Sequence, residues 1–267
     1  MARGKTKNWL GDKLVSEMRT VTGVIYYEVI GSTSADAPHI TLLHNFMSSG
    51  RTAWGGILSK LDGYRILLAD LPGHGRSLGH PPEYNYNDIS DQLADLMWQE
   101  NFGRGHLAGC SAGGMIAQLL VQKKSVQPAS LILVSTTYST NPAATGSGAQ
   151  LLAENFSASP KWLDATAQLH DPFQGDGYFY GELLPGFQAI RQQQWIDLPI
   201  ETLKTFTLPV CIIHGDQDEF FPVDIPERMH QMLPHSELHI IPQQTHALIF
   251  RQPWVVGAIM RTFLDSL

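Results

Sequence analysis

The chain has 267 residues, of which 43% are hydrophobic and 16% charged, a composition typical of a globular protein with a substantial core. The net charge of −7 argues against a nucleic-acid partner. The sequence has neither an apolar run of roughly 18 residues, as a membrane span needs, nor the apolar core of a signal peptide. Because Cys110 and Cys211 fall in predicted buried strands, we expect no disulfide. We therefore predict a cytoplasmic monomer or homodimer that contacts no membrane.

Strand-like and helix-like segments alternate along the chain. The first two strands are predicted as a hairpin, and the later alternation predicts an α/β fold with a mostly parallel sheet covered on both faces. Apolar runs predict strands near residues 14–21, 24–30, 39–44, 65–70, 105–110, 129–136, 209–214 and 236–242. Amphipathic runs predict helices near residues 52–61, 86–101, 112–123, 223–233 and 247–266.

The alternation stops between Thr137 and Phe206, where prolines divide the chain into short helical pieces. This interval is rich in aromatic side chains, which form either the walls of a ligand pocket or a small core of the interval itself. The sequence leaves both readings open. The aromatic residues are Tyr138, Phe156, Trp162, Phe173, Tyr178, Phe179, Tyr180, Phe187 and Trp195.

The segment from Gly109 to Gly113 reads Gly-Cys-Ser-Ala-Gly and lies between an apolar run and a helix-like pattern. Strand, sharp turn and helix is the context of a nucleophile elbow, in which the serine backbone is strained. Side chains at positions 109 and 113 would collide with the serine backbone, so glycine is needed at both. Ser111 is therefore the candidate nucleophile. The alternative is an ordinary N-cap serine beside flexible glycines.

Two later segments supply a candidate acid and a candidate base. Asp216 and Asp218 follow one predicted strand, and His246 follows the next. A serine hydroxyl needs a base within hydrogen-bond reach, and that base needs a carboxylate to set its tautomer. Because parallel strands end at one edge of a sheet, we expect these groups to meet Ser111 there.

Further motifs connect the chain with a known superfamily. Residues 40–54, ITLLHNFMSSGRTAW, resemble a strand followed by a His-Gly-x oxyanion loop. Residues 64–77, YRILLADLPGHGRS, match a strand and an Asp-x-x-Gly-x-Gly-x-Ser turn. With serine, acid and histidine in this chain order, the sequence resembles the α/β-hydrolase superfamily. It is most similar to small-molecule members, namely enol-lactone hydrolases, carbon–carbon bond hydrolases and a lyase of menaquinone synthesis.

The resemblance implies an eight-stranded α/β-hydrolase core formed by residues 1–136 and 207–267. A helical cap, residues 137–206, is then inserted after the sixth strand. The resemblance also selects Asp218 over Asp216, because the family's functional carboxylate is the second one, ahead of a proline.

The implied catalytic residues are Ser111, Asp218 and His246. The implied oxyanion hole consists of the backbone amides of Phe46 and Ala112. No metal and no organic cofactor is expected.

Asn45 departs from the family pattern, because it stands where the family usually has glycine. Asparagine tolerates a positive φ better than other non-glycine residues, so we expect Asn45 in or near the left-handed region, with its side chain toward the site. Asn45, Met47 and Trp162 are the candidate substrate contacts.

These features predict hydrolysis of a small, largely apolar ester, lactone or activated ketone through an acyl-enzyme. One alternative is a cofactor-independent lyase or dioxygenase, in which His246 and Asp218 act as a general base and Ser111 only hydrogen-bonds. A catalytically silent receptor or scaffold is a second alternative, which a full triad argues against. Dehalogenase and epoxide hydrolase chemistry is disfavoured, because the elbow residue is serine and not aspartate.

Overall fold

A computed structural model describes residues 14–81, 85–145, 160–189 and 196–267. Two aromatic residues of the proline-rich interval, Phe156 and Trp195, lie outside these ranges. The strands are β1 (Leu14–Arg19), β2 (Val24–Gly31), β3 (His39–Leu43), β4 (Arg65–Ala69), β5 (His106–Cys110), β6 (Leu131–Val134), β7 (Val210–Gly215) and β8 (Ser236–Ile241).

The strands form one eight-stranded sheet in the order β1-β2-β4-β3-β5-β6-β7-β8. β1 and β2 are antiparallel to their neighbours, whereas β3 to β8 run parallel. The carboxyl ends of these parallel strands therefore meet at one edge. The predicted α/β class with a mostly parallel sheet is confirmed.

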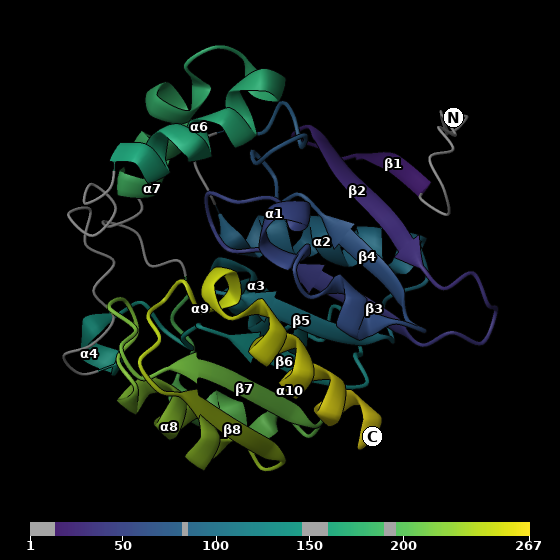
Figure 1. The fold of residues 1–267 in the computed structure, drawn as a ribbon, viewed down its shortest axis with the longest axis vertical. Coiled ribbons are helices and arrows are strands. Elements are labelled where there is room, and N and C mark those ends of the chain that lie inside the picture. The colour runs from purple at the N-terminus through teal and green to yellow at the C-terminus, as the bar shows by residue number, and fades with distance from the viewer. Residues whose placement is uncertain (1–13, 82–84, 146–159, 190–195) are drawn as a thin grey trace.

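Helices cover both faces of the sheet (Figure 1). On one face, α2 (Tyr86–Gln99), α3 (Ala112–Gln122) and α8 (Asp224–Met232) pack on one apolar core. On the other, α1 (Gly50–Trp54), α9 (Leu248–Arg251) and α10 (Pro253–Asp265) pack on a second core. The central strands are buried on both sides, which explains why they are apolar throughout.

Two predicted helices are interrupted. The helix expected over 52–61 is α1 followed by a separate 3-10 turn, η1 (Leu58–Leu61). The helix expected over 247–266 breaks at Gln252, where α9 ends and α10 begins with Pro253 at its first position. Proline cannot donate the backbone bond that would continue α9, whereas it suits the first turn of α10.

The described part of the interval after β6 is helical, but its longest helix has 15 residues and continues through Pro172, which was predicted to be a break. The two ends of the interval are joined by an isolated bridge between Ser139 and Asp197. The described helices between them are α4 (Pro142–Thr145), α6 (Pro160–Gln174), the π-helical turn η2 (Phe179–Leu183) and α7 (Leu184–Ala189), and the 3-10 turn η4 (Ile200–Thr205) leads back to β7. In Figure 1, α6 and α7 lie at one end of the molecule, and α4 lies apart from them.

The loop after β4 anchors α6 and the turn that follows it. The Gly75 amide donates to Nδ1 of His170 at 2.8 Å, and the Tyr178 hydroxyl donates to the Gly73 carbonyl at 2.9 Å. The Gln174 amide donates to the carbonyls of Gly75 and Ser77. These bonds hold α6 against the core.

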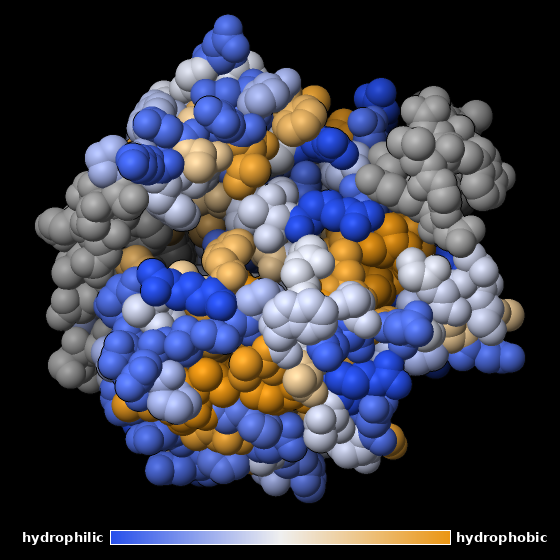
Figure 2. Space-filling model, in the orientation of Figure 1, coloured by the Kyte–Doolittle hydropathy of each residue, from blue (hydrophilic) through white to orange (hydrophobic). Residues whose placement is uncertain are grey.

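The surface of the described residues is mixed in character. Figure 2 shows hydrophilic side chains over much of this face and an apolar patch over the edge formed by β7 and β8. In the described part of the chain, no helix combines the length and the apolar character that crossing a membrane requires.

Candidate active site

Ser111 stands between β5 and α3 in a strained backbone conformation, with φ 50° and ψ −115°. Its amide donates to the Val134 carbonyl at 2.9 Å. Its own carbonyl accepts a bond of 2.8 Å from the hydroxyl of Thr136. Bonds to the end of β6 thus hold the turn in a conformation that non-glycine residues rarely adopt.

The neighbouring glycines are required by close backbone approach. A Cβ atom at Gly109 would lie 2.3 Å from the Gly113 carbonyl oxygen, and one at Gly113 would lie 2.2 Å from that of Leu43. Both clashes differ from our prediction, which had the two side chains collide with the serine backbone. Gly114 approaches Thr136, where a Cβ would lie 2.7 Å from the side chain. The elbow therefore depends on contacts with β3 and β6 as well as on its own turn.

We expect Gly113→Ala to destabilise the fold by about 2–4 kcal/mol, because the added carbon meets backbone atoms that cannot move aside cheaply. The matched control is Gly181→Ala on η2, where a Cβ would meet nothing within 4 Å. That variant should change stability by less than about 1 kcal/mol. Urea unfolding of both variants measures the difference, and equal midpoints would contradict the steric explanation.

Ser111, His246 and Asp218 form a continuous hydrogen-bonded row. The Ser111 hydroxyl lies 3.0 Å from Nε2 of His246. Nδ1 of the same ring lies 2.9 Å and 3.1 Å from the two carboxylate oxygens of Asp218. Each residue follows a different strand of the parallel sheet, so the topology brings together positions separated by more than a hundred residues. Asp216 is exposed and lies outside this row.

Asp218 is buried and held as a carboxylate. Oδ1 accepts the backbone amides of Phe220 and Phe221, both at 2.9 Å. Burial by itself raises the pKa of this carboxyl, but the charge and hydrogen bond of His246 and the donors around it outweigh burial. The pKa of Asp218 therefore lies below its ordinary value, and the group is ionised near neutral pH.

The same pairing acts in the opposite sense on His246. Burial lowers the pKa of the imidazole, whereas the charge and hydrogen bond of Asp218 raise it, and the net result lies above the ordinary value. The rings of Phe220 and Phe221 lie edge-on to the imidazole, with centroids 4.8 Å and 5.2 Å away. The ring is thus oriented by one carboxylate and two aromatic walls.

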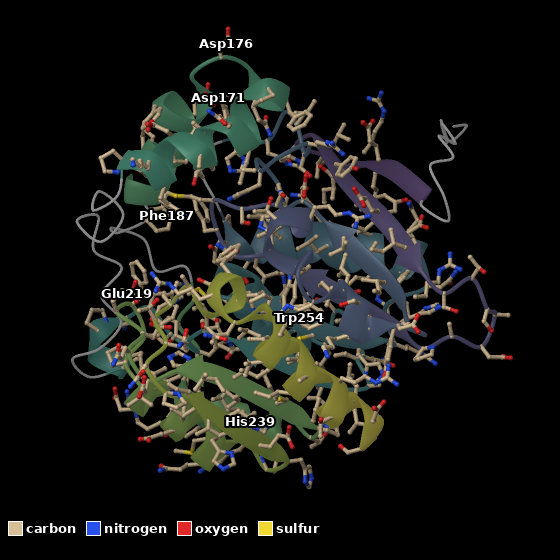
Figure 3. The ribbon with its side chains drawn as sticks, in the orientation of Figure 1. Asp171, Asp176, Phe187, Glu219, His239 and Trp254 are labelled. Carbon is tan, nitrogen blue, oxygen red and sulfur yellow. The ribbon has the colours of Figure 1, made fainter. Side chains whose placement is uncertain are left out.

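Two supporting residues had no role in the sequence prediction. Glu219 accepts the backbone amide of His246 at 2.9 Å, and Figure 3 shows it beside the ends of the strands. His214, on β7, donates from Nε2 to the Phe221 carbonyl at 2.7 Å and lies 3.4 Å from Asp218. Both hold the turn that carries the acid. The partner of Glu219 lies 27 residues further along the chain, whereas those of His214 lie within the turn that follows its own strand.

The loop after β3 differs from its prediction at Asn45. In this loop Met47 has a positive φ, of 60°, and Asn45 does not. The expected left-handed Asn45 is therefore wrong, and the strained position lies two residues further along. The Asn45 side chain donates to the Phe46 carbonyl at 3.0 Å, so its main contact is with the loop itself.

The other candidate contacts are spread between this loop and α6. Met47 and Phe46 are buried. The Phe46 ring packs against Phe187 of α7 with centroids 4.8 Å apart, and Figure 3 places Phe187 on the side of the helices that faces the core. Trp162 lies in the first turn of α6 and is 40% exposed. Ala112 is the buried first residue of α3.

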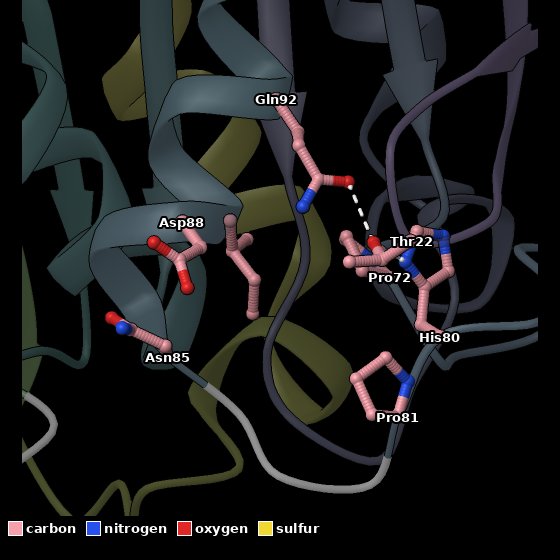
Figure 4. A pocket seen from close by; sticks show the side chains of 8 residues that line it. Thr22, Pro72, His80, Pro81, Asn85, Asp88 and Gln92 are labelled. Carbon is pink, nitrogen blue, oxygen red and sulfur yellow. Dashed lines mark hydrogen bonds between the residues drawn. The ribbon is translucent and has the colours of Figure 1, made fainter.

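A small pocket lies apart from the row of Ser111, His246 and Asp218. It encloses about 50 Å³, room for a few water molecules. Thr22 bonds to His80 at 2.9 Å in its wall, beside Gln92 (Figure 4). None of the three residues of the row lines it.

In the described ranges, one group has the spacing of a metal site: Cys211, Glu237 and His239, whose ligand atoms lie within 4.8 Å of one another. These residues lie within β7 and β8, toward the amino ends of the strands, and His239 is labelled in Figure 3. His239 already bonds to Glu237 at 2.9 Å. The group is therefore separate from the edge that carries Ser111.

Comparisons with known proteins agree with this architecture. The human serine hydrolase BPHL is 25% identical over 254 residues, covering 90% of this chain and 83% of that protein. A putative 2-succinyl-6-hydroxy-2,4-cyclohexadiene-1-carboxylate synthase of Bacillus subtilis is 25% identical, covering 93% and 98%. The crystal structure of the esterase RhEst1 from Rhodococcus superimposes with a TM-score of 0.75 at 22% identity, covering 95% and 99%.

The eight-stranded sheet, with its strained serine between strand and helix, defines the class of α/β-hydrolase-fold enzymes. The chain belongs to the alpha/beta hydrolase family, whose sequence model matches residues 42–258.

Proposed function

We propose that the protein hydrolyses a small, largely apolar ester, lactone or activated ketone through an acyl-enzyme at Ser111. The observation that carries this proposal is the row Ser111–His246–Asp218, with bonds of 3.0 Å and 2.9 Å. The similar proteins, a serine hydrolase and an esterase among them, favour the same chemistry. The apolar contact of Phe46 with Phe187 supports a largely apolar substrate.

In the proposed reaction the Ser111 oxygen attacks the substrate carbonyl while Nε2 of His246 takes the hydroxyl proton. Asp218 stabilises the imidazolium that forms. The amides of Phe46 and Ala112 then stabilise the negative oxygen of the tetrahedral intermediate. The intermediate expels its leaving group, which receives the proton from His246.

Water completes the cycle. His246, neutral again, takes a proton from water, and the hydroxide attacks the acyl carbon. Collapse of the second intermediate breaks the bond to Ser111 and returns the proton to its oxygen. The helices α6 and α7 are proposed to act as a cap that limits water and substrate shape, because α6 is bonded to the loop after β4 and Phe187 of α7 packs against Phe46 of the loop after β3.

Labelling with a fluorophosphonate tests this proposal. A single adduct on Ser111, found by intact mass and peptide mapping, is the expected result, together with a burst of p-nitrophenol from p-nitrophenyl butyrate. The His246→Ala variant should lose both signals, since it lacks the base. Absence of the adduct and of the burst in the unmodified protein would overturn the acyl-enzyme proposal.

A further inference from the structure

In the loop between β3 and α1, two side chains hydrogen-bond to the carbonyl oxygens of successive residues. Nδ1 of His44 lies 2.7 Å from the carbonyl oxygen of Asn45. The side-chain amide of Asn45 lies 3.0 Å from the carbonyl oxygen of Phe46. The residue that follows, Met47, has the positive φ of 60°. A non-glycine residue in that conformation is strained, so the loop must be held by other contacts.

The tautomer of His44 follows from its second partner. The backbone amide of Leu71 donates to Nε2 at 2.8 Å, and a backbone N–H can only donate. Nε2 is therefore unprotonated, and the single ring proton is on Nδ1, where it is donated to the Asn45 carbonyl. Burial lowers the pKa of His44 to about 3, so this neutral form persists at any pH at which the enzyme works.

The orientation of the Asn45 side chain is equally constrained. Its Nδ2 donates to the Phe46 carbonyl. Rotating the amide by half a turn would place two acceptor oxygens together, which is unfavourable. In this orientation Oδ1 is buried and has no hydrogen-bond partner among the described residues, a cost that the bond to Phe46 offsets in part.

These bonds determine where the Phe46 amide points. A trans peptide is planar, and its N–H and C=O groups point in opposite directions. Fixing the Asn45 carbonyl toward His44 therefore directs the Phe46 N–H away from the ring. The bond from the Asn45 side chain to the Phe46 carbonyl also restrains the peptide group that follows Phe46. A donor that is aimed before the reaction needs no reorganisation when negative charge develops.

We propose that His44 and Asn45 are positioning residues that aim the Phe46 amide at the oxyanion. On this view the asparagine at position 45 replaces glycine because its side chain supplies a donor, and not because its backbone tolerates a positive φ. The inference rests on the proposed function, in which the Phe46 amide stabilises the tetrahedral intermediate.

Two substitutions of His44 separate its two bonds. His44→Asn retains a donor near the Nδ1 position, whereas His44→Gln retains an acceptor near the Nε2 position for Leu71. Each loses one hydrogen bond, so their melting temperatures should be similar. With p-nitrophenyl butyrate, His44→Gln should lower kcat by up to ~10²–10³-fold, the range for loss of one oxyanion donor, with little change in KM. His44→Asn should stay within about tenfold of the unmodified enzyme.

Asn45→Leu provides a third variant, similar in size and unbranched at Cβ but without a donor. It should lower kcat by roughly tenfold, as expected for one neutral hydrogen bond, again with KM little changed. If kcat falls equally in all three variants and follows the melting temperature, the residues are merely structural and the proposal is overturned.

A measurement that needs no activity separates this inference from the proposed function. Nitrogen NMR of ¹⁵N-histidine-labelled protein, with His44 assigned by its loss in His44→Gln, should show a pyrrole-type Nδ1 and a pyridine-type Nε2. The reversed pattern would refute the proposed positioning role of His44 even in an active hydrolase. The expected pattern, in a protein that fails to form the acyl-enzyme, would support the positioning role of His44 while refuting the hydrolase proposal.

Discussion

Ser111→Ala is expected to lower the turnover of p-nitrophenyl butyrate by about 10⁴–10⁶-fold, because serine hydrolases lose most of their acceleration with the nucleophile. The fold should persist, since the substitution removes one oxygen that bonds only to His246 among the described side chains. Steady-state kinetics and fluorophosphonate labelling measure the two consequences.

Ser135→Ala is the matched control. Ser135 directly follows the neighbouring strand β6, is buried, and also has a positive φ, of 44°. It should retain near-normal turnover. A cofactor-independent lyase or dioxygenase would need Ser111 only as a hydrogen-bond partner, worth ~1–3 kcal/mol or roughly ten- to a hundred-fold. A loss of only that size in Ser111→Ala would refute the acyl-enzyme and favour a reaction driven by His246 and Asp218.

Asp218→Asn is expected to lower kcat by about 10⁴-fold without unfolding the protein, because the amide favours the wrong imidazole tautomer and cannot stabilise the imidazolium. Asp216→Asn is its control, since Asp216 is exposed in the same turn and lies outside the hydrogen-bonded row. Near-normal kcat in Asp218→Asn together with a large loss in Asp216→Asn would show that the acid has been misassigned.

The pH profile provides a second readout of the same pair. His246 acts as a base only when neutral, so kcat/KM falls as the pH drops through its pKa. Asp218 holds that pKa above the ordinary value. Removing the negative charge lowers the pKa, and the acidic limb of the residual activity of Asp218→Asn should move to lower pH. An unmoved limb would mean that the titrating group is not His246.

Much of the architecture follows from local sequence patterns. Both ends of each predicted strand lie within two residues of the ends of the matching observed strand. The central strands could be predicted well because a strand buried on both faces must be apolar throughout. The elbow around Ser111 was also predictable, because a Gly-x-Ser-x-Gly pattern between an apolar run and a helix-like pattern is typical of this turn. Because the acidic turn and His246 each follow a predicted parallel strand, the sequence also predicts that the sheet gathers them at one edge, and the family resemblance selects Asp218 over Asp216.

Tertiary structure decides what depends on contacts between distant segments. Gly113 is required by the carbonyl of Leu43 on another strand, and Glu219 binds the backbone of a residue far along the chain. In the loop after β3, Met47 and not Asn45 has the positive φ, and His44 of this loop accepts a bond from the distant Leu71 amide. A sequence pattern reports which conformations a residue tolerates; the partners that select one of them are brought together by the fold.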